Sequence, residues 1–117
     1  MEALIAIATP LIQKVEGFRQ FPYKDTTGNF TIGYGHNLSA NGINLITGEF
    51  ILQCDLENAL VACKAKIDFF DKLNLARQYI LLNMAFNMGI GGLLAFEKML
   101  NAMRIDQFND AALELRN

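Results

Sequence analysis

Two carboxylates and a hydroxyl lie within one run of the sequence, residues 16–36. Glu16 and Asp25 are nine residues apart, and Thr31 follows six residues after the aspartate. Hydrolysis of a glycosidic bond uses two carboxyl groups that flank the bond, one of them as a proton donor. The glycines and aromatic residues around these side chains indicate a shaped site, so the run predicts this kind of chemistry.

Glu16 is the candidate general acid. A carboxyl that protonates a leaving oxygen must keep its proton near neutral pH. The sequence places Glu16 in the last turn of a helix, where free carbonyl groups disfavour an ionised carboxylate, and Phe18 would add apolar surface. The alternative is a solvated glutamate beside Lys14 or Arg19, which is the usual environment of a helix glutamate.

Asp25 is the candidate partner. We expect its carboxyl to be ionised, either to activate water as a base or to stabilise positive charge on a sugar ring. Residues 25–28 read Asp-Thr-Thr-Gly, which is also favourable turn chemistry. An ordinary turn aspartate therefore remains the alternative.

A helix and a small sheet must position these residues. Thr9 and Pro10 are expected to be the N-cap and first position of the helix, and Gly17 its C′ residue. Residues 2–8 could form a preceding turn of helix. Residues 18–46 are rich in strand-favouring side chains and turn signals, and they predict two or three short antiparallel strands.

The remaining residues have helical periodicity. We expect Thr47 to cap one helix, and Asn74 to cap the next, which ends at Gly89. A helix over 93–103 and another capped by Asp106 would follow. A helix, a small sheet and a helical bundle together predict an α+β fold.

Composition limits the class of protein. A chain of 117 residues with 52% hydrophobic residues fits one domain with a real core. The net charge of −2 and the pI of about 5.3 give no basic surface for nucleic acid. The N-terminal apolar stretch lacks the basic start of a secretory signal and is too short to span a bilayer.

Cys54 and Cys63 are the two cysteines. If both lie on one helix, their spacing places them on opposite faces, too far apart to form a disulfide. We expect two free, buried thiols. Two cysteines and a single histidine are too few for a zinc site, and the sequence predicts no metal and no cofactor.

The run EGFRQFPYKDTTGNFTIGYGH, residues 16–36, resembles the signature of the phage-type lysozymes, or endolysins, of glycoside hydrolase family 24. That signature has a helix glutamate, a turn aspartate, and a threonine before an I-G-x-G-H strand. Residues 83–96, NMAFNMGIGGLLAF, are similar to the family's buried helix that ends in glycines. The resemblance implies one lysozyme-like domain over 1–117, with a sheet lobe at about 18–46 and a helical lobe at about 47–117.

The resemblance also implies roles for individual residues. Thr31 would hold the attacking water by a hydrogen bond. If Asp25 and Thr31 place that water on the face opposite Glu16, the reaction inverts the anomeric carbon. Asn37 and Phe86 would contact the glycan, with core packing an equal alternative for Phe86.

Three further residues would be structural neighbours of the site. In the family the histidine at the place of His36 is usually a buried ion-pair or hydrogen-bond partner. Gly33 and Gly35 would permit close backbone approach in a tight sheet.

The implied activity is that of a muramidase, which cleaves the β-1,4 bond between N-acetylmuramic acid and N-acetylglucosamine in bacterial peptidoglycan. The family is made in the host cytoplasm and lyses the cell once a separate pore-forming protein lets it reach the wall. Two alternatives remain: a wall-binding or structural module without turnover, and a lytic transglycosylase that cleaves without water.

The chain departs from the family at its end. Family members continue past Asn117 with a segment whose arginine pairs with the catalytic glutamate. We expect the chain to lack this segment, which would leave a helical face exposed over which two copies could associate.

Overall fold

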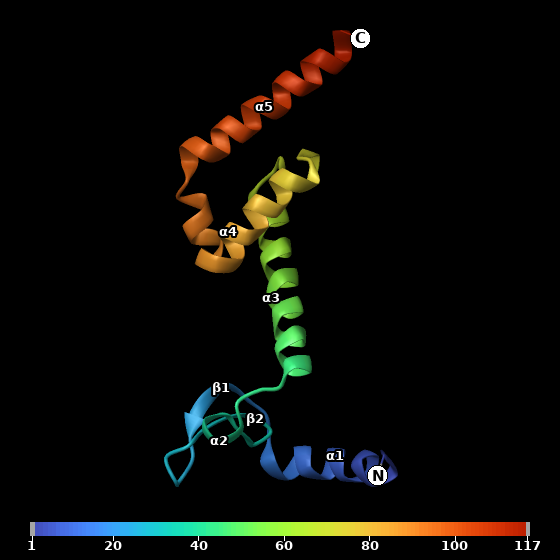
Figure 1. The fold of residues 1–117 in the computed structure, drawn as a ribbon, viewed down its shortest axis with the longest axis vertical. Coiled ribbons are helices and arrows are strands. Elements are labelled where there is room, and N and C mark those ends of the chain that lie inside the picture. Colours follow the sequence, from blue (N-terminus) through green and yellow to red (C-terminus); the bar gives the residue numbers. More distant parts are fainter. Residues whose placement is uncertain (1, 117) are drawn as a thin grey trace. The chain divides into compact units, whose positions relative to one another are not determined.

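The computed structural model describes residues 2–116 and the side chains of residues 2–106. The elements, coloured along the chain in Figure 1, are α1 (Glu2–Glu16), β1 (Arg19–Lys24), β2 (Phe30–Gly33), β3 (His36–Asn37), α2 (Leu38–Asn41), α3 (Leu45–Lys66), the 3-10 turn η1 (Phe70–Lys72), α4 (Leu75–Leu94) and α5 (Glu97–Arg116). This order confirms the predicted α+β class. The chain divides into two compact units, residues 1–48 and 49–117.

Helix α1 begins before the expected cap at Thr9, and the helical turn over residues 2–8 is continuous with it. It starts at Glu2, so that Pro10 lies in its interior and Thr9 is not an N-cap. The Thr9 hydroxyl instead donates to the carbonyl of Ile5 at 2.7 Å. Residues 2–8 contain alanine, leucine and glutamate, which are strong helix formers. Their helix propensity keeps the backbone helical on the N-terminal side of Pro10, although the proline removes one backbone hydrogen bond.

The end of α1 is as predicted. Gly17 has a φ of 69°, and its N–H donates to the carbonyl of Gln13 at 3.0 Å. A residue at positive φ is a common way to end a helix, and glycine adopts that conformation without steric cost. Glu16 is therefore the last residue of α1.

The three strands form one antiparallel sheet in the order β1-β2-β3, which confirms the predicted small sheet. Thr31 lies on the central strand, opposite Tyr23 of β1 and Asn37 of β3. The turn between β1 and β2 contains Asp25, and the turn between β2 and β3 contains Gly35.

Helix α3 begins at Leu45, two residues before the expected cap. Asn44 is the residue that caps it, because its side-chain oxygen accepts from the N–H of Thr47 at 2.9 Å. Asparagine is at least as good an N-cap as threonine, and Asn44 comes first in the chain. The prediction of Thr47 as the cap is therefore wrong.

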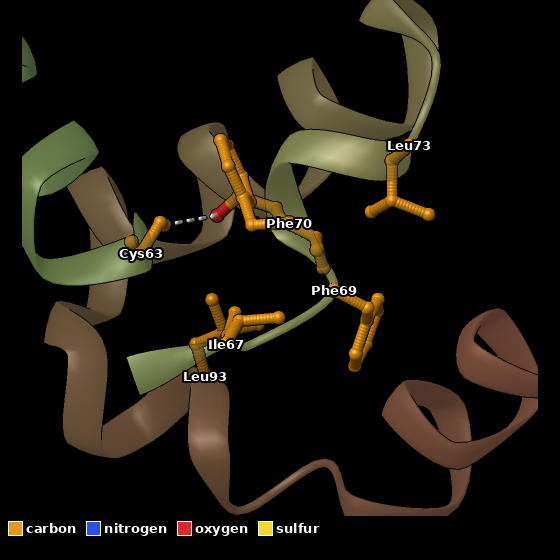
Figure 2. Packing of buried hydrophobic residues seen from close by; sticks show 8 residues of the cluster. Cys63, Ile67, Phe69, Phe70, Leu73 and Leu93 are labelled. Atoms are coloured by element: carbon orange, nitrogen blue, oxygen red, sulfur yellow. Dashed lines mark hydrogen bonds between the residues drawn. The ribbon is translucent and has the colours of Figure 1, made fainter. Parts of the chain in front are cut away.

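The core of the second unit is made by α3, η1 and α4. Figure 2 shows its buried side chains, which are Cys63, Ile67, Phe69, Phe70, Leu73, Leu81, Ala85 and Leu93. The dashed line there joins the Cys63 thiol to the carbonyl of Leu81 at 3.9 Å. Cys54 is free but exposed, so the expectation that both thiols are buried holds only for Cys63.

Helix α4 has the predicted cap and the predicted break. The side-chain oxygen of Asn74 accepts from the N–H of Arg77 at 2.9 Å. Gly89 interrupts the helix with φ 76° and ψ 163°, after which the helix resumes as far as Leu94. The first helical segment therefore ends at Gly89, as predicted, and a short second segment continues to Leu94.

Helix α5 is continuous from Glu97 to Arg116. The prediction of a helix end near residue 103 and a new cap at Asp106 is wrong. The Asp106 carboxylate approaches the guanidinium of Arg77 at 3.8 Å, a partner on another helix that local sequence does not reveal. Within residues 2–116, no single helix is long and apolar enough to cross a membrane. Helix α4 and the start of α5 together have the length and composition of a membrane span, but the two are bent by 101° relative to each other.

Candidate active site

The carboxyl of Glu16 lies against the backbone of Gly35. A Cβ atom placed on Gly35 would lie 3.2 Å from Oε2 of Glu16 and 3.6 Å from its Cδ. The aromatic rings of Phe18 and Tyr34, one residue from Gly17 and one from Gly35, have centroids 5.4 Å apart. These contacts join the end of α1 to the turn between β2 and β3.

Asp25 is held at the start of the turn that connects β1 to β2. Its Oδ1 accepts three hydrogen bonds: from the Thr27 hydroxyl at 2.7 Å, from the Thr27 N–H at 2.9 Å and from the Asn29 N–H at 2.9 Å. Oδ1 therefore fixes the carboxylate, and Oδ2 has no hydrogen bond from a described side chain.

The same contacts favour the ionised form of Asp25. The hydrogen bond from the Thr27 hydroxyl, followed by that from the Asn29 backbone, lowers the pKa of this carboxyl below its ordinary 3.8. Hydrogen bonds to a charged carboxylate stabilise that form. Asp25 therefore carries a negative charge at neutral pH, as a base or a charge stabiliser must.

Thr31 is buried on the central strand, with 5% of its surface exposed. Its hydroxyl donates to the carbonyl of Asn29 at 3.4 Å, which is a long and weak hydrogen bond. Since the N–H of Asn29 bonds to Asp25, this one residue links the turn carboxylate to the threonine. The structure thus connects Asp25 with Thr31 through a short chain of hydrogen bonds.

The strand β3 carries the two other predicted residues of this unit. His36 is exposed, not buried, and its Nε2–H donates to the carbonyl of Gly42 at 2.5 Å. The side-chain oxygen of Asn37 accepts from the N–H of Ala40 at 3.0 Å and so caps α2. The Asn37 amide group is the part of this side chain that could still donate to a glycan.

The two predicted glycines differ in their surroundings. Gly33 and Gly35 both have positive φ, 66° and 81°. A Cβ atom on Gly33 would meet nothing within 4 Å, whereas one on Gly35 would meet Glu16. The close neighbour of Gly35 is therefore the side chain of Glu16 and not a second backbone, and what distinguishes Gly33 is its positive φ alone.

Phe86 belongs to the second unit, where it is 39% exposed on α4. It lies at an open groove of about 310 Å³, which is lined by Asp55, Asn58, Ala59, Ala62, Ala85, Phe86, Gly89 and Ile90. An aromatic face beside small apolar side chains and two hydrogen-bonding groups suits a sugar ring chemically.

Thr27 and Asn29 are the residues that sequence analysis missed. They hold Asp25 in place and lower the pKa of its carboxyl. The Asp-Thr-Thr-Gly-Asn order could have revealed them, because a turn aspartate commonly accepts from the backbone and hydroxyl groups two residues later. In the portion with described side chains, no three histidine, cysteine, aspartate or glutamate side chains are grouped as a metal site requires.

Two comparisons with known proteins bear on these residues. The family model described as phage lysozyme matches residues 13–117, a range that includes all eight site residues predicted from the sequence. The chain is also 25% identical, over an alignment of 143 residues, to the "Probable T4-type lysozyme 2" of Dictyostelium discoideum. That alignment covers 97% of this chain and 84% of the relative.

Proposed function

Since the chain belongs to the phage lysozyme family, we propose that it is a muramidase that hydrolyses the β-1,4 bond between N-acetylmuramic acid and N-acetylglucosamine. Family membership supports a lysozyme-like peptidoglycan hydrolase, and the choice of bond is our proposal. The observation that carries it is the turn of Asp25, which fixes an ionised carboxylate by Oδ1, while Oδ2 has no hydrogen bond from a described side chain.

In the proposed reaction Glu16 donates its proton to the glycosidic oxygen, so that the leaving sugar departs as a neutral alcohol. A water molecule attacks the anomeric carbon from the opposite face and gives its proton to Oδ2 of Asp25. Solvent then returns a proton to Glu16 and removes one from Asp25. No covalent intermediate forms, and the configuration at the anomeric carbon inverts.

Thr31 is proposed to hold the attacking water. Its hydroxyl hydrogen points to the carbonyl of Asn29, which leaves the oxygen lone pairs to accept a hydrogen bond from water. Because Asn29 also binds Asp25, the water and its base would be positioned by the same turn. Asn37 and Phe86 are proposed as glycan contacts outside this reacting centre.

We also propose that the protein acts as an endolysin, made in the host cytoplasm and active on the wall after a separate protein opens the membrane. Expression in a bacterium should then leave cells intact until the inner membrane is permeabilised. Lysis without permeabilisation would contradict this route.

The proposed activity is tested by the release of reducing ends from purified peptidoglycan. We expect release by the unaltered chain and none by Glu16→Gln. The matched control is Glu2→Gln, which neutralises a glutamate at the other end of the same helix. Circular dichroism and thermal melting establish that each variant is folded.

The products separate this function from its alternatives. Anhydro-sugar ends in place of reducing ends would identify a lytic transglycosylase. Binding to peptidoglycan that persists in Glu16→Gln, with no cleavage by the unaltered chain, would identify a wall-binding module.

A further inference from the structure

We propose that Gly35 is a positioning residue for the reaction, because its bare backbone sets where the Glu16 carboxyl can lie. This inference rests on the proposed function, since it matters for turnover only if Glu16 donates the proton. Gly35 does not touch the reacting atoms in this scheme. It acts through the glutamate.

The contact itself is close. The position that a Cβ would occupy on Gly35 lies 3.2 Å from Oε2, 3.6 Å from Cδ and 3.9 Å from Cγ of Glu16. Non-bonded heavy atoms have their optimal separation at about 3.5–4.0 Å. Even the methyl group of alanine would therefore press on the carboxyl oxygen, and the end of the Glu16 side chain would have to move.

Neither backbone can easily withdraw from this contact. The turn that contains Gly35 lies between the paired strands β2 and β3, with Ile32 opposite His36. The Glu16 backbone is held at the end of α1, where the Gly17 N–H bonds to the preceding turn. Since both chains are fixed, the flexible carboxyl is the part that would be displaced.

Displacement of the carboxyl affects turnover more than substrate binding. Proton transfer requires the donor oxygen within hydrogen-bond distance of the glycosidic oxygen. A misplacement of about 1 Å in a catalytic arrangement can cost roughly 100-fold in rate, and the few tenths of an ångström required by this contact should cost correspondingly less. An added methyl at residue 35 should therefore lower kcat and leave KM nearly unchanged.

Gly33 provides the matched control. It has a φ of 66°, against 81° for Gly35, so that alanine at either position is strained by the backbone conformation. A Cβ on Gly33 meets no atom within 4 Å. Gly33→Ala therefore reproduces the strain without the contact to Glu16.

The experiment measures kcat and KM on peptidoglycan fragments for the unaltered chain, Gly35→Ala and Gly33→Ala. We expect Gly35→Ala to lose roughly 3- to 10-fold in kcat with KM within about twofold. Gly33→Ala should keep most of its kcat. Equal kcat losses in the two variants, or a loss confined to KM, would overturn the inference.

A second measurement tests the contact even if Gly35→Ala folds poorly. Thermal melting of Gly35→Ala is compared in the unaltered background and in Glu16→Ala, which removes all three contacting atoms. We expect the drop in Tm to shrink in the second background. An undiminished drop would overturn the inference, whereas inactivity of the unaltered chain would refute the proposed function instead.

Discussion

Asp25 and Asn29 bind each other in both directions across the β1–β2 turn. The backbone N–H of Asp25 donates to the Asn29 carbonyl at 2.9 Å, and the N–H of Asn29 donates back to Oδ1 of Asp25 at 2.9 Å. Among the residues with described side chains, the hydrogen bonds that fix the candidate base all come from its own turn. The charge and orientation of this carboxylate can be tested by changing the turn alone.

Removal of the Thr27 hydroxyl should raise the pKa of Asp25 toward its ordinary value. That hydroxyl makes the strongest of the contacts that lower it. Thr27→Val keeps the shape and the backbone N–H. It removes the hydroxyl, which donates to Asp25 and accepts from the side-chain amide of Asn29 at 3.0 Å. NMR titration of the Asp25 carboxyl measures the change. Thr26→Val is the control, and an equal shift in both variants would contradict the assignment.

The folded protein should lose stability in acid through Asp25. Its pKa is lowered on folding from about 3.8, so the stabilisation is present above that value and is lost as pH falls through the lower, folded pKa. Tm measured from pH 5 downward should decline less steeply in Asp25→Asn than in the unaltered chain. Parallel curves would show that the carboxylate contributes nothing to this decline.

Hydrolysis should release the product first as the α-anomer. The attacked bond is β, and a water positioned by Asp25 and Thr31 on the face opposite Glu16 inverts the centre. Proton NMR at early times, before mutarotation, distinguishes the two anomers. The β-anomer appearing first would show that the second carboxyl acts as a nucleophile with retention.

A single thiol should react in the folded protein. Cys54 is exposed and Cys63 is buried, and burial raises the pKa of the Cys63 thiol, which reduces its thiolate fraction. An aromatic disulfide reagent should titrate one thiol at once and the second only after denaturation. Cys54→Ser should abolish the fast reaction, and its persistence would place Cys63 at the surface.

Truncation of Leu81 should strongly destabilise the second unit. Its side chain is fully buried, and Leu→Ala at such a site costs about 2–5 kcal/mol of unfolding free energy. Leu75 lies on the same helix and is 82% exposed, so Leu75→Ala should cost less than about 0.5 kcal/mol. Denaturant unfolding measures both, and similar losses would contradict the observed core.

Local signals predicted the features that depend on neighbouring residues. Gly17 ends α1 because a positive φ suits glycine, and Asn74 caps α4 because its side chain reaches a backbone N–H three residues away. The expected cap at Asp106 was wrong because the helix runs on through this residue. Its carboxylate lies 3.8 Å from the guanidinium of Arg77, a residue far away in the sequence. The cap at Thr47 was wrong because Asn44 competes for the same backbone groups.

In the candidate site too, the contacts between near neighbours in sequence could be predicted, and the contact between separate elements could not. The turn residues that hold Asp25 lie within four positions of it, so the sequence contained the information needed to find them. The contact between Glu16 and Gly35 joins a helix end to a strand turn. Spacing along the chain indicates neither its distance nor its direction, and the folded backbone is required to see it.

The closeness in sequence of Glu16, Asp25 and Thr31 has a consequence for how the protein is made. All three lie within the unit that ends at residue 48, and the bonds around Asp25 span no more than four residues. Contacts of such short range form quickly, because little chain entropy is lost in closing them. During synthesis on the ribosome, the turn that orients the base can form before the helices that complete the chain have been translated.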